Sequence, residues 1–163
     1  IHKIMKRLIE ENNNTAIEYD RIFEERVLKK VDSFDQKRWK LLSKYFKGGK
    51  LIDLGCLDSL IPLVMKITYP SSEIWGLDQT PKTIDFLKKE YPMINYIVGD
   101  VYKTGFPNNY FDYVIAGELI EHLERPEEFI KDLAKLRLLS YIEILAITKS
   151  VCLRHISTII SDR

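Results

Sequence analysis

The sequence has little of several features that mark specialised classes of protein. Its 163 residues include two cysteines, Cys56 and Cys152, which are too few for a disulfide framework, so a reducing compartment is expected. Seven glycines and six prolines are too few for a fibrous or low-complexity chain, and 45% hydrophobic residues are typical of a folded protein with a core. We therefore expect one globular domain.

An excess of one charge and long apolar runs are also lacking. The 25 Lys and Arg residues balance 24 Asp and Glu, and a formal net charge of +1 predicts no general attraction to nucleic acid or to an anionic membrane. No run approaches the roughly 18 apolar residues that span a bilayer, and the first residues do not match a signal peptide. The sequence predicts a cytoplasmic protein with no membrane span and no nucleic-acid partner.

The pattern of apolar residues changes at residue 48. Residues 1–47 repeat apolar side chains at intervals of three and four, which predicts two or three helices that pack on the core. Residues 48–163 alternate short apolar runs with helical stretches and form the predicted core of a single domain. Strands are predicted at 50–54, 73–78, 94–98, 111–116 and 141–147, and helices at 59–69, 80–91 and 126–139.

Alternating strands and helices of these lengths predict an α/β fold. Right-handed crossovers between successive strands would give a Rossmann-like, doubly wound, mostly parallel sheet flanked by helices. Only sixteen residues follow the fifth predicted strand, so we expect a short or incomplete C-terminal part in which 151–160 supplies one more strand. The sheet edge left exposed would favour a homo-oligomer through that edge.

Acidic residues follow the predicted strands, where ligands bind in open parallel sheets. Asp78 lies 25 residues after Asp53, near the offset at which an acid accepts both hydroxyls of a ribose. Asp78 has a second possible role, as a cap for the helix that begins at Thr80 and Pro81. Asp100 follows the third strand and is either a ligand residue or an ordinary turn residue.

The turn after the first strand argues against a dinucleotide. Dinucleotide binding requires G-x-G-x-x-G, and the three glycine positions are occupied here by Gly55, Leu57 and Leu60. Asp58 adds a negative charge where a diphosphate would lie, with no basic neighbour. The turn therefore disfavours NAD, FAD and an oxidoreductase, and a cationic nucleoside without phosphates fits better.

Four motifs in order resemble those of the class I S-adenosylmethionine-dependent methyltransferases. Across residues 51–133, LIDLGC resembles the family's first motif, WGLD its second, VGD its third and FDYVIAGELIEHL its fourth, with similarity to ubiquinone-pathway O-methyltransferases. The resemblance implies S-adenosylmethionine as cofactor and transfer of its methyl group to an oxygen or nitrogen of a small-molecule acceptor. The alternative is a non-catalytic protein of the same fold that binds a partner or the cofactor without turnover.

The resemblance also implies a place for each candidate cofactor residue. Those around the methionine part would be Asp53, Gly55, Cys56 and Gly117, and those around the nucleoside would be Asp78, Gln79, Asp100 and Val101. Tyr19 lies in a segment that resembles the helix before the first motif, and it would close over the site. Cys56 has an alternative role as a small buried thiol that only packs.

His122 is the candidate catalytic residue, because a base near the methyl group can take a proton from the acceptor. On an α-helix, Glu118 would share a face with His122, and Glu121 would lie beside it. This spacing resembles the metal site of small-RNA 3′-terminal methyltransferases, but the further histidine has only His155 as a candidate, and no metal is predicted. A packing or capping role for His122 stays open.

Two segments depart from the family's usual pattern. Leu57 and Ser59 stand where glycine is usual, and a side chain at Leu57 narrows the approach to the cofactor. Residues 135–140 contain neither the proline nor the glycines of the usual turn before the fifth strand. The C-terminal departures favour the non-catalytic alternative, whereas the acids at Asp78 and Asp100 favour the enzyme.

Overall fold

The computed structural model describes Trp39 and residues 42–57, 59–117, 119–133 and 135–136. The helices predicted before Trp39, the strands predicted at 141–147 and 151–160, and the candidate residue Tyr19 lie outside the described residues. The division of the chain into segments 1–47 and 48–163 therefore stays a prediction.

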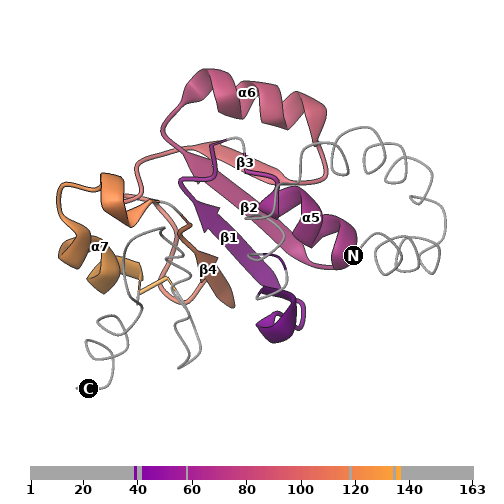
Figure 1. Cartoon of the computed structure of the whole chain (residues 1–163), viewed down its shortest axis with the longest axis horizontal. Coiled ribbons are helices and arrows are strands. Elements are labelled where there is room, and N and C mark those ends of the chain that lie inside the picture. Colours follow the sequence, from indigo (N-terminus) through magenta and orange to yellow (C-terminus); the bar gives the residue numbers. More distant parts are fainter. Residues whose placement is uncertain (1–38, 40–41, 58, 118, 134, 137–163) are drawn as a thin grey trace.

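Four parallel strands form the sheet of the described region. They are β1 (Lys50–Leu54), β2 (Glu73–Asp78), β3 (Asn95–Val98) and β4 (Tyr113–Ile115), in the spatial order β3-β2-β1-β4 (Figure 1). The prediction is confirmed for all four strands. β1 and β2 have the predicted bounds, whereas β3 and β4 are shorter than predicted.

Three α-helices follow these strands: α5 (Ile61–Thr68), α6 (Pro81–Glu90) and α7 (Pro126–Leu133). Each has a proline in its first turn, where the missing N–H group costs no helical hydrogen bond. Thr80 occupies the N-cap position of α6 as predicted, but its side chain makes no capping hydrogen bond. None of the described helices has the length and apolar character needed to cross a bilayer.

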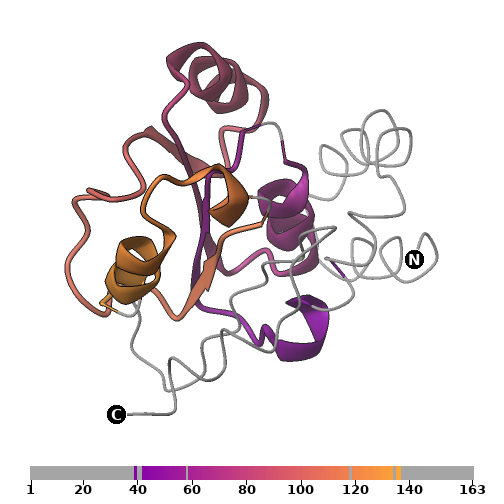
Figure 2. The ribbon, with the colours of Figure 1, turned by 60° about the vertical axis from the view of Figure 1, so that its left-hand side comes forward.

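Helices cover both faces of the sheet, which confirms the doubly wound α/β fold (Figure 2). On one face, α5 and α6 enclose a core that includes Leu51 and Leu63. On the other face, α7 contributes Phe129 to a core that includes Ile52 of β1. Leu51 and Ile52 are successive, fully buried residues of β1. Because side chains alternate between the faces of a strand, β1 contributes to both cores.

The connections place the topological switch point between β1 and β4. From β1 the chain crosses to β2 and β3 on one side, and it then returns to the other side of β1 to form β4. Ligands of open α/β sheets bind in the crevice that such a reversal leaves at the carboxyl ends of the strands. The register pairs Asp53 of β1 with Ile115 of β4, so the carboxylate of Asp53 belongs to this edge.

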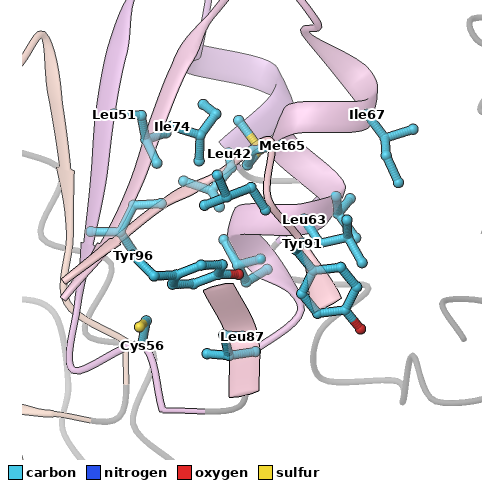
Figure 3. Packing of buried hydrophobic residues seen from close by; sticks show 14 of the residues in the cluster. Leu42, Leu51, Cys56, Leu63, Met65, Ile67, Ile74, Leu87, Tyr91 and Tyr96 are labelled. Atoms are coloured by element: carbon cyan, nitrogen blue, oxygen red, sulfur yellow. The ribbon is translucent and has the colours of Figure 1, made fainter. Parts of the chain in front are cut away.

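Gly76 lets an aromatic ring pack directly on β2. A Cβ atom at this position would lie 2.7 Å from the ring of Tyr96 and 2.9 Å from the Sγ atom of Cys56. Both residues are buried in the core on the side of α5 and α6, where Figure 3 shows them. The missing side chain of Gly76 therefore makes room for the Tyr96 ring.

Gly76→Ala is expected to lower the free energy of unfolding by about 1–3 kcal/mol, because the added methyl group must displace a ring in a closely packed core. Urea denaturation followed by circular dichroism measures this loss. The same substitution should cost less in a Tyr96→Leu background, which lacks the ring. Equal costs in the two backgrounds would contradict this packing explanation.

Candidate functional site

A small pocket lies at the switch point, where the ends of β1 and β4 meet the start of α5. Its volume is about 20 Å³, and its lining residues are Leu42, Asp53, Gly55, Ser59, Ile61, Ile115 and Gly117. Three of them, Asp53, Gly55 and Gly117, are residues that the sequence resemblance assigned to the methionine part of a cofactor. The fold therefore brings these three together from the two sides of the switch point.

The turn after β1 is bound to the end of β2. The N–H groups of Gly55 and Cys56 both donate to the carbonyl of Leu77, at 2.8 and 3.1 Å. Gly55 has a φ of +69°, which glycine adopts without steric cost. Leu57 has a φ of +38°, which strains a residue with a Cβ atom, and its side chain is 48% exposed. Leu57 thus holds a backbone conformation that suits glycine better.

Asp78 joins this turn to the start of α6. Asp78 is only 7% exposed. Its Oδ2 atom accepts the N–H of Leu57 at 3.0 Å, and its Oδ1 atom accepts the N–H of Thr80 at 2.9 Å. An ionised carboxylate has about four acceptor sites, of which these two bonds use two. The two roles weighed for Asp78, at a helix start and at a ribose, are therefore geometrically compatible.

Two exposed apolar residues are joined to Asp78 through their backbones. Leu57 donates its N–H to the carboxylate, and Val98 of β3 is paired in register with Asp78. Their side chains are 48% and 45% exposed, whereas most large apolar side chains in the described region are buried. A hydroxyl acceptor with exposed apolar residues in its neighbourhood suits a ribose with an attached base.

Asp100 shapes the exposed turn that follows β3. Its Oδ1 atom accepts the N–H of Tyr102 at 2.9 Å, and its backbone carbonyl accepts the N–H of Lys103 at 2.9 Å. The carboxylate keeps acceptor capacity for a further donor, such as the amine of an adenine. Gln79 is exposed after β2 and Val101 is half-buried after β3, so both lie at the edge where the cofactor residues were predicted.

The thiol of Cys56 belongs to the core and is not part of the pocket lining. The residue is 1% exposed and lies beside Tyr96 (Figure 3). Burial raises the pKa of the thiol, and the nearby carboxylates of Asp53 and Asp78 raise the pKa further. The thiol is therefore protonated at neutral pH, which suits the packing role weighed for it.

His122 lies in a short 3-10 helix, Ile120–His122, that follows β4. This differs from the α-helix on which a shared face of Glu118 and His122 was expected, and Glu118 lies outside the described residues. The side chains of Glu121 and His122 are exposed. His122 therefore offers its imidazole to solvent in the segment that leaves the switch point.

The metal pattern considered for this segment is not assembled in the described ranges. Among those residues, no group of three or more His, Cys, Asp or Glu side chains is placed to hold a metal ion. Glu118 and His155, which the pattern would use, both lie outside these ranges.

Sequence reasoning missed several contributors to the site. Ser59, Ile61 and Leu42 line the pocket. Leu119 lies over the first turn, since a Cβ atom on Gly55 would come within 2.8 Å of its Cδ1 atom. Ser59 and Leu119 follow strand ends closely enough to have been proposed from the sequence. The helical periodicity around Leu42 contains no signal for which end of the sheet that residue meets.

Comparison with known proteins identifies the family. A family whose description is "Methyltransferase domain" matches residues 52–137, more than half of the chain. The chain belongs to the class I S-adenosylmethionine-dependent methyltransferases. The matched region starts within β1 and extends past α7, so it includes the strand ends that form the pocket.

Two curated relatives are mitochondrial ubiquinone biosynthesis O-methyltransferases. The protein of Arabidopsis thaliana is 27% identical over 124 residues, which cover 72% of this chain and 38% of the relative. The protein of Schizosaccharomyces pombe is 30% identical over 92 residues, which cover 52% and 32%. The solved structure of PH0226 protein from Pyrococcus horikoshii is 26% identical, with a TM-score of 0.56 over 66% of this chain and 55% of that chain. The chain spans about a third of the length of these curated relatives.

The buried thiol gives a prediction about reactivity and pH. In a Cys152→Ser variant, Cys56 should react with a disulfide reagent only as fast as the core opens, because it is buried and protonated. The free energy of unfolding should fall above about pH 9, by up to ~1.4 kcal/mol per pH unit, because the unfolded thiol loses its proton while the folded thiol keeps it.

Denaturation between pH 8 and 9.5 measures the pH effect, and absorbance of the released thiolate measures the labelling rate. Cys56→Ala is the control, since it removes the titrating group and should reduce the fall in stability. Rapid labelling of the native Cys152→Ser variant would show that the thiol is accessible.

Proposed function

We propose that the protein transfers the methyl group of S-adenosylmethionine to an oxygen or nitrogen atom of a small-molecule acceptor. The observation that carries the proposal is the buried Asp78 carboxylate, which keeps acceptor capacity beside its two backbone bonds and is joined through the backbone to the exposed residues Leu57 and Val98. The ubiquinone biosynthesis O-methyltransferases among the relatives favour a hydroxyl group on a small molecule as the acceptor.

The charges at the pocket suit this cofactor. Its sulfonium and ammonium groups are both positive, and the carboxylate of Asp53 lines the pocket. The described part of the turn, residues 53–57 and 59–60, contains no lysine or arginine to neutralise a diphosphate. The same residues therefore favour a cationic nucleoside over a dinucleotide.

The pocket is too small to hold the methionine part of the cofactor unless a side chain moves. A volume of about 20 Å³ holds about one water molecule, which is less than the methionine part of the cofactor needs. Leu119 overlies Gly55, which is one of the lining residues. We infer that the Leu119 side chain shifts when the cofactor binds.

Each cofactor residue has a role in this proposal that its position allows. Asp78 accepts the ribose hydroxyls at the sites that its two backbone partners leave open. Asp100 accepts the adenine amine, while Gln79 and Val101 border the ring. Gly117, which lines the pocket, would contact the methionine amine through its backbone. Tyr19, outside the described residues, would close over the bound cofactor.

Methyl transfer requires the protein to align the acceptor with the methyl group and to remove a proton from the acceptor. When bound, the cofactor supplies a methyl group already activated by its positive sulfur, so a correctly placed acceptor is the main requirement. In this proposal the strand ends and the turn after β1 hold the cofactor, and the segment after β4 meets that turn through Leu119. His122 lies in that segment and takes the acceptor's proton as the new bond to carbon forms.

Calorimetric titration tests the cofactor class. S-adenosylmethionine and its demethylated product should bind, and NAD, as the control ligand, should not. Asp78→Ala should weaken cofactor binding roughly 5- to 150-fold, as expected for the loss of hydrogen bonds to a charged group. Asp85→Ala removes an exposed carboxylate of α6 and should leave the affinity unchanged.

The outcomes separate the alternatives. Asp78 also holds the first turn, so circular dichroism must show that Asp78→Ala is folded, and Asp78→Asn provides a second variant. Unchanged affinity in both would assign Asp78 to the turn alone. A folded wild-type protein that binds neither S-adenosylmethionine nor its product would favour the non-catalytic alternative.

His122→Gln should lower kcat by a factor of about 100 or more while cofactor affinity stays within twofold, because a general base acts on the acceptor and not on cofactor binding. Transfer of a radiolabelled methyl group to a panel of small phenols, alcohols and amines measures kcat. Glu121→Gln changes the neighbouring exposed side chain and is the matched control. Wild-type turnover in His122→Gln would exclude the base role, and loss of folding would indicate packing.

A further inference from the structure

A tyrosine connects the turn after β3 to the segment after β4. The backbone N–H of Arg125, immediately before α7, donates to the Oη atom of Tyr102 at 3.0 Å. The Arg125 guanidinium lies over the Tyr102 ring, with its central carbon 4.7 Å from the ring centroid. The ring also meets Phe129 of α7 edge to face, with the centroids 6.1 Å apart. One side chain thus makes three contacts with the start of α7.

The backbone of the same tyrosine is held by Asp100. The Oδ1 atom of Asp100 accepts the N–H of Tyr102 at 2.9 Å, and the carbonyl of Asp100 accepts the N–H of Lys103. A ligand that donates to the remaining acceptor sites of this carboxylate therefore acts on the group that orients Tyr102. A single hydrogen bond, from the Tyr102 N–H to Asp100, therefore connects binding at Asp100 to the position of the Tyr102 ring.

The segment that Tyr102 holds, residues 119–125, includes His122. Two residues separate His122 from Arg125, whose N–H is bound to Tyr102. At its other end, the segment rests on the first turn through Leu119, which overlies Gly55. The segment that carries the imidazole is therefore held at both ends. Leu119 contacts the first turn at one end, and Arg125 bonds to Tyr102 at the α7 end.

We propose that Tyr102 is a positioning residue that couples nucleoside binding at Asp100 to the position of His122. The inference rests on the proposed function, since it takes Asp100 as a nucleoside contact and His122 as the base. A ring that only filled space would need its contact with Phe129 but not the hydrogen bond from the Arg125 N–H. The hydroxyl is what fixes the backbone of the His122 segment to the nucleoside edge of the sheet.

The response of the His122 imidazole to a bound nucleoside tests this coupling. Histidine labelled with ¹³C gives one signal for each imidazole, and His122→Gln assigns the His122 signal. Addition of S-adenosylhomocysteine should shift that signal in the wild-type protein. In Tyr102→Phe the shift should fall to half or less, while the affinity for S-adenosylhomocysteine stays within threefold.

Tyr110→Phe is the matched control. Tyr110 lies in the same connection between β3 and β4, but its hydroxyl bonds to Glu73 of β2 at 3.5 Å and to Lys50 of β1. This variant should keep the full His122 response. Tyr102→Ala removes both the ring and the hydroxyl and should abolish the response, and Tyr102→Phe decides the matter if Tyr102→Ala does not fold.

The outcomes distinguish this inference from the proposed function. A full response in Tyr102→Phe, or no response in a wild-type protein that binds S-adenosylhomocysteine, overturns the coupling and leaves the cofactor assignment intact. A folded wild-type protein that does not bind S-adenosylhomocysteine overturns the proposed function and this inference with it.

Discussion

The parallel pairing of β1 on both of its edges is the constraint on which the site depends. β1 pairs with β2 along one edge and with β4 along the other, while Leu51 and Ile52 bury its two faces in separate cores. A shift of one residue would exchange the faces of the strand and carry Asp53 out of the crevice. Because two cores fix the register together, the strand ends that bear Asp53 and Asp78 meet at one edge before any ligand arrives.

Asp78 orders the backbone at this edge of the sheet through two hydrogen bonds. A buried carboxylate requires hydrogen bonds, and here the N–H groups of Leu57 and Thr80 supply two of them. Because these partners are backbone groups, both bonds form without a lysine or arginine side chain. The bond to Leu57 also helps to hold a backbone with a φ of +38°, so the strain at that residue is compensated by the contact that orders the turn.

The strands and the acids at their ends could be predicted from the sequence because both depend on local patterns. KLIDL and EIWGLD are short, mostly apolar runs that carry an acid at the last or next-to-last position. In a parallel sheet the carboxyl ends of the strands lie at the same edge, so the two acids are expected there. Cys56 shows the limit of such reasoning, since its neighbour Gly55 lines the pocket while its own thiol turns into the core beside Tyr96. The 3-10 helix at His122 was also beyond prediction, because three residues are too few to distinguish a period of 3.0 from one of 3.6.

The two ends of the crevice differ in how firmly they are held. At the end formed by β2 and β3, the side chains of Asp78 and Asp100 accept N–H groups, and Gly99 donates to the carbonyl of Asp78 at 2.9 Å. A surface formed in advance lowers the entropy cost of binding. At the other end, the His122 segment is held by i→i+3 bonds from His122 and Leu123, a weaker geometry than that of an α-helix. Under the proposed function, a nucleoside would meet an ordered surface, whereas His122, the candidate base, lies at the less firmly held end. The contact of Tyr102 with Arg125 and Phe129 links these two ends as well as packing between them.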